Sequence, residues 1–299
     1  MPNYFLPKGI EQLTEATSIA LANSLQFQKI ATPLSQAEIT TAFVHQGSIE
    51  QGGNLSPIVF LHGFDSSVLE WRRLLPLLSS DRELWAIDLL GFGFTERPLG
   101  LSFNSEAIKA HLYSTWKALI ARPVTLVGAS MGGAAAIDFT LTYPEIVEKL
   151  ILIDSVGFTG GATAGKFLFP PLDYIATQFL RNPKVRQKIS EKAYYNPSFA
   201  SPDALCCAAL HLDCPNWQQA LISFTKSGGY GSFKDRLAQV QPPSLILWGD
   251  RDRILGTKDA ENLRRVIPHS QLIWIEASGH VPHLEQPQST AKHIREFSG

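Results

Sequence analysis

A serine flanked by small residues is the first feature of this sequence that suggests chemistry. Ser130 lies in the segment VTLVGASMGGAAA. The β-branched and apolar residues before it predict a buried strand, and the glycines and alanines after it predict a helix that packs closely on a sheet. Gly128 and Gly132 let the backbone turn sharply between the two elements. This Gly-x-Ser-x-Gly pattern is typical of a nucleophilic serine at a strand-to-helix corner.

A serine hydroxyl is a poor nucleophile at neutral pH. It needs a base within hydrogen-bond reach, an acid behind the base, and donors for the developing oxyanion. Two later loops supply candidates for the acid and the base. The loop GDRDRI offers Asp250 and Asp252, and the loop ASGHVPHLEQP offers His280 and His283. Each loop follows a predicted strand, so we expect these side chains at the same sheet edge as Ser130.

The elements that must position these residues form an alternating pattern. Short apolar runs recur with helical segments between them, which indicates an α/β fold with a mostly parallel sheet and helices on both faces. A leading amphipathic helix is predicted over residues 10–27. The predicted strands cover residues 38–45, 57–63, 83–91, 124–130, 149–155, 244–250 and 271–278.

The alternation is interrupted once, between Gly157 and Pro243. This stretch is helix-like and punctuated by prolines, and no strand-like run occurs in it. Ligands bind at the C-terminal edge of a parallel sheet. We therefore expect residues 157–243 to form a helical cap, or lid, over the site, and residues 1–156 and 244–299 to form the core.

Composition narrows the class of protein. The 299 residues carry a net charge of −1 without a basic run, so nucleic acid is not an expected partner. Neither a membrane-spanning stretch nor a signal-peptide pattern is found, and a cytoplasmic location is expected. The three clustered cysteines indicate reduced thiols rather than disulfides or a zinc site, and no motif implies a metal or cofactor.

These motifs, in this order, resemble the α/β-hydrolase superfamily over nearly the whole chain. In that family the acid follows a Gly-x-x-Asp pattern, which selects Asp252, and the base follows a Gly-His-x-Pro pattern, which selects His280. The resemblance thus implies a catalytic triad of Ser130, His280 and Asp252. Some members place the acid after the preceding strand, where Asp154 is the alternative. Asp250 is then expected to be structural.

The resemblance also implies roles for the residues around the triad. The backbone N–H groups of Phe64, in the HGF motif, and Met131, after the nucleophile, are expected to form the oxyanion hole. His62 and Asp88 are expected to be structural residues, with Asp88 bracing a loop. His283 is expected as a neighbour in the cleft or at the start of the next helix.

A serine at this corner favours acyl transfer, and the resemblance implies hydrolysis of a carboxylic ester. Stretches such as HGFDSSVLEWRRLLPLL and LHLDCPNWQQALISFTKSGGY look like the chloroplast and cyanobacterial hydrolases that include chlorophyll dephytylase. This predicts a lipophilic ester as substrate, such as the phytyl ester of chlorophyll. Peripheral membrane contact through Phe167–Pro171 or the N-terminal helix would then be needed. The alternatives are a generic carboxylesterase or lipase, a C–C bond hydrolase of the same fold, and a non-catalytic ligand-binding member.

Overall fold

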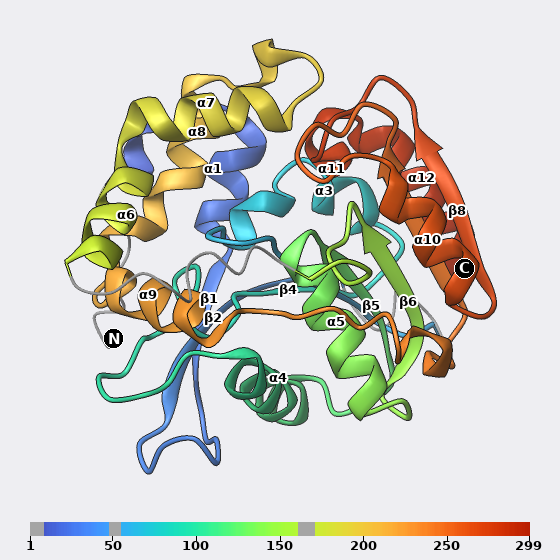
Figure 1. The fold of residues 1–299 in the computed structure, drawn as a ribbon, viewed down its shortest axis with the longest axis horizontal. Helices are drawn as coiled ribbons and strands as arrows, with labels where there is room; N and C mark the ends of the chain where they lie inside the picture. The colour runs from blue at the N-terminus through green and yellow to red at the C-terminus, as the bar shows by residue number, and fades with distance from the viewer. Residues whose placement is uncertain (1–8, 48–54, 161–170) are drawn as a thin grey trace.

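The computed structural model describes residues 9–47, 55–160 and 171–299. Its centre is an eight-stranded sheet in the order β1-β2-β4-β3-β5-β6-β7-β8, with helices on both faces (Figure 1). The pairs β1–β2 and β2–β4 are antiparallel, and every other neighbouring pair is parallel. The strands are β1 (Leu25–Ile30), β2 (Ile39–Gln46), β3 (Ile58–Leu61), β4 (Leu84–Ile87), β5 (Val124–Ala129), β6 (Val147–Ile153), β7 (Ser244–Gly249) and β8 (Ser270–Ile275).

The apolar runs form the sheet that the sequence predicts. Strands β3, β4, β5 and β7 are buried at every residue, as expected for parallel strands covered on both faces. The predicted helix over residues 10–27 is wrong at its C-terminal end. Helix α1 covers only Ala16–Asn23, after a short 3-10 turn at Ile10–Gln12, and residues 25–27 already belong to β1. The segment LQFQKI alternates with a period of two at its start and pairs with β2, which overrides the helical spacing.

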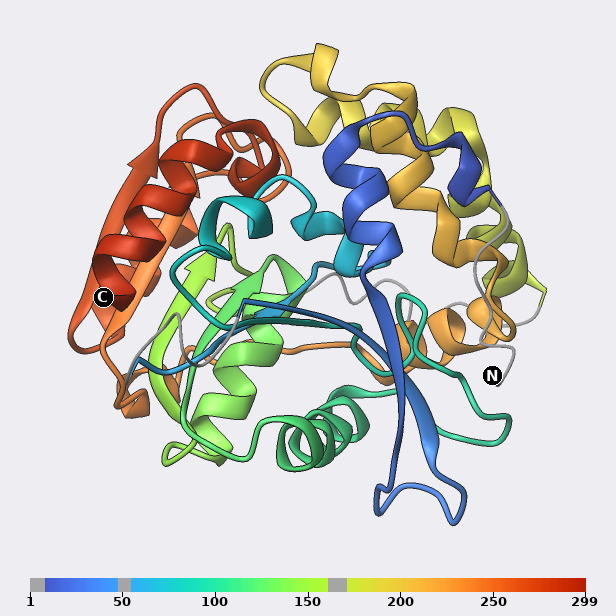
Figure 2. The same ribbon diagram turned by 180° about the vertical axis from the view of Figure 1, so that it is seen from behind.

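Two hydrophobic clusters lie on opposite faces of the sheet, and strands β2 to β8 contribute residues to both. In β3, Val59 and Leu61 join the cluster that contains α4, α5 and α10, whereas Ile58 and Phe60 join the cluster that contains α1, α3 and α12 (Figure 2). The bounds of these helices are α3 (Leu75–Leu78), α4 (Ser105–Leu119), α5 (Met131–Thr142), α10 (Lys258–Val266) and α12 (Pro287–Ser298). Both faces are therefore closed, and the strand ends remain for the site.

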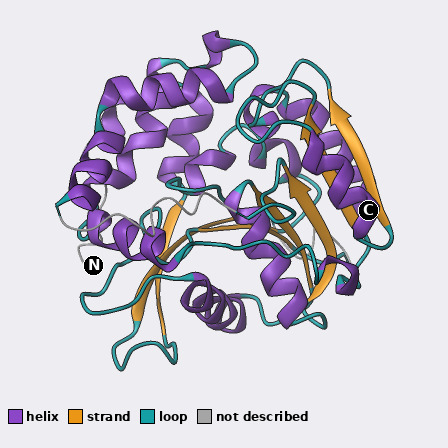
Figure 3. Cartoon of the chain, in the orientation of Figure 1, coloured by secondary structure: helices purple, strands orange, loops and turns teal. Residues whose placement is uncertain are grey.

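The described part of the chain between β6 and β7 contains helices and connecting loops but no strand, and we call residues 171–240 the helical insertion. It lies over one side of the sheet edge (Figure 3). That it forms a domain of its own stays a prediction. Its elements are α6 (Leu172–Arg181), α7 (Pro183–Ala193), η4 (Pro197–Phe199), α8 (Pro202–Ala209), η5 (Leu210–Asp213), α9 (Trp217–Ser227) and η6 (Leu237–Gln239).

The N-terminal helix is attached to the helical insertion through one buried carboxylate. Asp203, in α8, accepts hydrogen bonds from the backbone N–H groups of Thr14 (2.6 Å) and Glu15 (2.9 Å) and from the Ser18 hydroxyl (2.6 Å). Glu15 is the N-cap residue of α1 and its own side chain makes no capping bond. A residue 188 positions away in the sequence therefore caps this helix.

Candidate active site

The corner between β5 and α5 holds Ser130 in a conformation that is rare for any residue other than glycine. Its φ is 51° and its ψ is −117°. A Cβ atom on Gly128 would lie 2.2 Å from the carbonyl oxygen of Gly132, and one on Gly132 would lie 2.1 Å from that of Leu61. The two glycines are therefore required by close backbone contacts, and the sharp turn projects the serine from the strand end.

The three residues selected for the triad are brought together. The Nε2 atom of His280 lies 3.0 Å from the Ser130 hydroxyl oxygen, and its Nδ1 atom lies 3.0 Å from a carboxylate oxygen of Asp252. The other oxygen of Asp252 accepts the N–H groups of Ile254 (2.7 Å) and Leu255 (3.1 Å). Burial alone would raise the pKa of Asp252, but His280 and these N–H groups hold it below its usual value. Asp252 is therefore ionised and fixes the orientation of the imidazole.

The alternative acid, Asp154, lies behind Asp252 rather than against the histidine. It is fully buried at the end of β6 and accepts the Gly249 N–H at 3.1 Å. Burial, and then the negative charge of Asp252, raise the pKa of Asp154 well above its usual value, which favours its protonated form. Asp250 points elsewhere, with a carboxylate oxygen 3.3 Å from the guanidinium of the next residue. The structure therefore pairs His280 with Asp252.

The same acids and histidine are the one group in the described part of the chain that is compact enough to hold a metal ion. The potential ligand atoms of Asp154, Asp252 and His280 lie within 4.8 Å of one another. The raised pKa of Asp154 favours its uncharged form, which binds cations poorly, and His280 already bonds Asp252 and Ser130. The arrangement suits proton transfer to and from the serine better than cation binding.

The two predicted oxyanion donors belong to two segments that meet at the nucleophile. Phe64 follows Gly63 in the loop after β3, and a Cβ atom on Gly63 would lie 3.5 Å from the Cβ of Ser130. Met131 is the first residue of α5, where N–H groups have no acceptor within the helix. Their role as the oxyanion hole stays a prediction that this placement permits.

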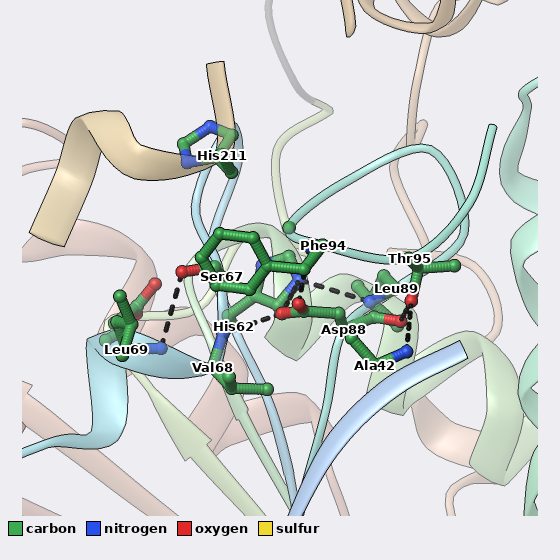
Figure 4. Close-up of polar contacts among 12 residues, drawn as sticks. Ala42, His62, Ser67, Val68, Leu69, Asp88, Leu89, Phe94, Thr95 and His211 are labelled. Atoms are coloured by element: carbon green, nitrogen blue, oxygen red, sulfur yellow. Dashed lines mark hydrogen bonds and ion pairs between the residues drawn. The ribbon is translucent and has the colours of Figure 1, made fainter. Parts of the chain in front are cut away.

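A buried aspartate braces the loop behind these donors, as expected for Asp88 (Figure 4). Its two carboxylate oxygens accept the N–H groups of Val68 and Phe94, each at 2.6 Å. The Thr95 hydroxyl donates to the backbone carbonyl of Asp88 at 2.9 Å. The oxygen of the same hydroxyl accepts the Ala42 N–H at 3.1 Å. Burial raises the pKa of Asp88 to about 7. Its position under the loops, away from Ser130, fits a structural role.

Gly63 is held by hydrogen bonds on both sides. The Leu89 N–H donates to His62 Nε2 (3.1 Å), which leaves His62 Nδ1 to donate to the Gly63 carbonyl (2.8 Å). Burial lowers the pKa of His62 to about 4, so it is neutral. Glu70 accepts the Gly63 N–H (2.9 Å) and lies 3.1 Å from Nε2 of the buried His283. Glu70 therefore links the loop that carries Phe64 to the loop that carries the catalytic histidine candidate, a role that sequence reasoning missed.

Asp65, the residue after Phe64, joins the same loop to the helical insertion. One oxygen accepts His211 Nε2 (3.0 Å) and Trp217 Nε1 (2.8 Å), and the other lies 2.8 Å from the guanidinium of Arg186. Burial would raise the pKa of Asp65, but these partners hold it below its usual value. Its partners are 121 to 152 positions away, so no local pattern in the sequence indicates this role.

The loop of His280 is joined to the helical insertion as well. The His280 N–H donates to the Ala193 carbonyl at 2.7 Å. Glu285 accepts the N–H groups of Gly279 (2.8 Å) and Asn196 (2.6 Å). The position of the histidine therefore depends on residues at the end of α7 as well as on β8.

A cavity of about 320 Å³ opens beside Ser130 and His280. Its lining is largely apolar and includes Leu180, Ile189, Val281 and Leu284. In its lining, Phe64 and Ile189 are exposed, which marks the mouth, whereas Arg72, Tyr194 and Cys207 are buried, and we call these three residues the inner end of the cavity. The cavity is large enough for part of a small-molecule substrate.

Comparison with known proteins places the chain in a family. A family model described as the alpha/beta hydrolase fold matches residues 56–287, and the chain belongs to this family. It is 33% identical to the alpha/beta hydrolase domain-containing protein VTE7 of Arabidopsis thaliana, over 98% of this chain and 89% of that protein. It is 29% identical to a 2-hydroxy-6-oxo-2,4-heptadienoate hydrolase of Pseudomonas putida, over 81% of this chain and 88% of that enzyme.

A solved structure gives the same result. The fold is similar to that of a thermophilic esterase from Thermogutta terrifontis, described in a malate-bound form, with a TM-score of 0.76 and 25% identity. The match covers 91% of this chain and 97% of that one. The chain is thus an α/β hydrolase whose relatives include esterases and C–C bond hydrolases.

Proposed function

We propose that this α/β hydrolase is a serine esterase that cleaves a carboxylic ester of a lipophilic alcohol through an acyl-enzyme. The continuous hydrogen bonding from Ser130 through His280 to Asp252, beside an apolar cavity, is the observation that carries the proposal. Hydrolysis of this kind needs a nucleophile, a base and an orienting acid in this geometry.

The reaction follows from the positions of these groups. His280 Nε2 accepts the Ser130 proton as the hydroxyl oxygen attacks the ester carbonyl carbon, and Asp252 stabilises the resulting imidazolium. The N–H groups of Phe64 and Met131 stabilise the negative oxygen of the tetrahedral intermediate. The alcohol leaves with the proton from His280. Water, deprotonated by His280, then attacks the acyl-enzyme and releases the acid.

The lining of the cavity supports a lipophilic substrate. Each methylene group moved from water into apolar surroundings contributes about 0.8 kcal/mol, so a hydrocarbon chain would bind along residues such as Leu180 and Leu284. As the finer substrate we propose the phytyl ester of chlorophyll, on the resemblance of the sequence to chlorophyll-dephytylating hydrolases. With a cavity of about 320 Å³, only one part of so large a molecule would be enclosed, and the rest would lie at the mouth.

Such a substrate would require contact with a membrane surface. No helix in the described ranges is long and apolar enough to cross a bilayer. Of the segment Phe167–Pro171, residues up to 170 lie outside the described part of the chain. Helix α6, which follows, exposes Leu172, Ile175 and Phe179 on one face. We propose this face as the peripheral contact.

The chain's similarity to a dienoate hydrolase favours C–C bond cleavage as the second candidate. A non-catalytic binding protein is less consistent with a complete triad. Product analysis separates these functions. Purified wild-type protein is incubated with detergent-dispersed chlorophyll, with nitrophenyl esters of increasing chain length, and with a 2-hydroxy-6-oxo-dienoate.

The variant Ser130→Ala identifies the nucleophile in this experiment. We expect it to lower ester turnover by about 10³-fold or more, whereas Ser80→Ala, at an exposed serine, serves as the control. Chlorophyllide formed only by the wild type would support the finer substrate. Ester turnover without formation of chlorophyllide would support the proposed esterase activity but exclude chlorophyll as its substrate. Cleavage of the dienoate alone would replace the esterase with the second candidate.

A further inference from the structure

We propose that Arg72 forms a second binding site within the cavity, which takes a carboxylate carried by the substrate. Arg72 follows the 3-10 turn η2 (Val68–Trp71), is 2% exposed, and lines the cavity that contains Ser130. Its Nη1 atom donates to the Leu69 carbonyl at 3.3 Å. Its Nε and Nη2 atoms are buried and have no hydrogen-bond partner among the described residues.

The two unpaired nitrogens make this guanidinium specific for one kind of ligand. Nε and Nη2 lie on the same edge of the planar group, and their parallel N–H bonds match the two oxygens of a carboxylate. The guanidinium stays charged in proteins, and leaving its N–H groups buried without an acceptor costs free energy. A carboxylate would supply both acceptors and the missing counter-charge.

The acidic residues nearby are already engaged. Glu15 pairs with Arg73, with 2.6 Å between oxygen and nitrogen, and Glu70 bonds Gly63 and His283. No ion pair with Arg72 occurs within residues 9–47, 55–160 and 171–299. The inner end of the cavity therefore holds a cation without a carboxylate partner of its own.

The neighbours of Arg72 at this end leave room for a polar group next to an apolar stem. Tyr194 and Cys207 line the same end. The Tyr194 hydroxyl lies near the guanidinium but makes no hydrogen bond of normal geometry with Nε or Nη2, and burial raises its pKa, so it supplies no counter-charge. Apolar residues such as Leu284 and Val281 line the rest of the cavity. The site thus fits an ester with a short hydrocarbon stem that ends in a carboxylate. This inference rests on the proposed esterase. Because chlorophyll carries no free carboxylate, such an ester would take the place of the phytyl ester of chlorophyll as the finer substrate.

Two series of esters locate the carboxylate. In the first series, the carboxylate lies at the end of the acyl part, and the compounds are mono-nitrophenyl esters of straight-chain dicarboxylic acids from adipate to suberate. In the second series, the carboxylate lies at the end of the alcohol part, and the compounds are butyrate esters of ω-hydroxy acids. Each compound is compared with its neutral methyl ester, and the ratio of kcat/KM, charged over neutral, is measured after subtraction of a Ser130→Ala blank.

We expect a ratio of at least about tenfold for one chain length in one series with the wild type. Arg72→Met should bring this ratio to about one, and Arg72→Lys, which keeps the charge but loses the planar edge, should leave an intermediate ratio. Arg73→Met is the matched control, because Arg73 does not line the cavity, and it should keep the wild-type ratio. Equal ratios in wild type and Arg72→Met, or no charged preference in either series, would overturn the proposal.

Failure of the proposed function gives a different result. If the wild type cleaves neither charged nor neutral esters, the proposed esterase function is wrong. The Arg72 site is then tested by binding measurements alone. Calorimetric titration of Ser130→Ala with adipate and suberate should then show binding that the added substitution Arg72→Met removes. If Arg72→Met does not fold, the charged-over-neutral ratio of the wild type and that of Arg72→Lys still test the proposed carboxylate site. If the wild type neither prefers the charged esters nor binds the dicarboxylates, the Nε/Nη2 edge of Arg72 does not bind a carboxylate, and the proposal is wrong.

Discussion

The two walls of the cavity are held in place in different ways. On the sheet side, Ser130, Asp252 and His280 each follow a strand end within a few residues, so the backbone of the sheet fixes their spacing. On the helical side, the insertion depends on a few buried side chains, chiefly Asp65 and Glu285, that reach across to it. A hydrolase of this fold can therefore keep its chemistry on one wall while the other wall determines the substrate.

The largest expected effect comes from a substitution in the catalytic residues on the sheet side of the cavity. Asp252→Asn keeps the shape of the side chain but no longer stabilises the imidazolium or the required tautomer of His280, so kcat should fall by about 10⁴-fold. Asp154→Asn is the matched control. Because burial and the charge of Asp252 raise the pKa of Asp154 and favour its uncharged form, its amide should leave kcat within a few-fold of wild type. Ester hydrolysis at pH 7 measures both, and the reverse result would assign the acid to Asp154.

The next effect would loosen the helical wall. Asp65→Asn leaves the partly buried Arg186 without its counter-charge. Breaking a fully buried pair costs about 3–5 kcal/mol, so we expect a loss of unfolding free energy of about 3 kcal/mol or less here. Asp213→Asn removes an exposed partner of Arg181 and should cost less than about 1 kcal/mol. Urea unfolding measures both variants. Similar losses in the two would show that Asp65 does not hold the insertion.

A third change tests the contact between the two loops of the sheet-side wall. The pKa of Glu70 is lowered from 4.5 to about 2, because the effect of His283 outweighs that of burial. A lowered carboxyl pKa stabilises the folded state above the unfolded value, and this contribution is lost as pH falls from about 4.5 to 2. Glu70→Gln should therefore lower stability at pH 7 by on the order of a few kcal/mol and flatten its dependence on pH in acid.

Urea unfolding at pH 7, 5 and 3.5 checks this expectation. Glu106→Gln, at an exposed acid that pairs with Lys109, is the control and should keep the wild-type slope. If Glu70→Gln and the wild type lose stability in parallel between pH 5 and 3.5, the pairing with His283 does not stabilise the fold.

The smallest effect concerns the outer surface of the helical wall. Phe179→Ser removes a 62% exposed ring from the proposed membrane contact without touching the cavity lining. We expect weaker binding to lipid vesicles in a flotation assay, by about 1–2 kcal/mol for one side chain, and unchanged turnover of a dispersed short-chain ester. Equal flotation of variant and wild type would exclude this face as the contact.

The contrast between the walls also explains what could be read from the sequence. Ser130, Asp252 and His280 lie in short motifs at strand ends, so local patterns locate them and the parallel sheet brings them together. Asp65 lies in the same loop as Phe64 and Glu70 in the 3-10 turn η2 that follows it. Both act through partners distant in the sequence, which no local pattern shows. The missed strand β1 has the same cause, because pairing with β2 overrides the local helical spacing.

The capping of α1 by Asp203 has a consequence for how this protein can be recombined. An insertion exchanged with that of a relative would take away the acceptor for Thr14, Glu15 and Ser18, and the first turn of α1 would lose its cap. Such a loss costs about 1–2 kcal/mol. The helical insertion is therefore not an interchangeable module, and a functional chimera would need to inherit the N-terminal helix together with it.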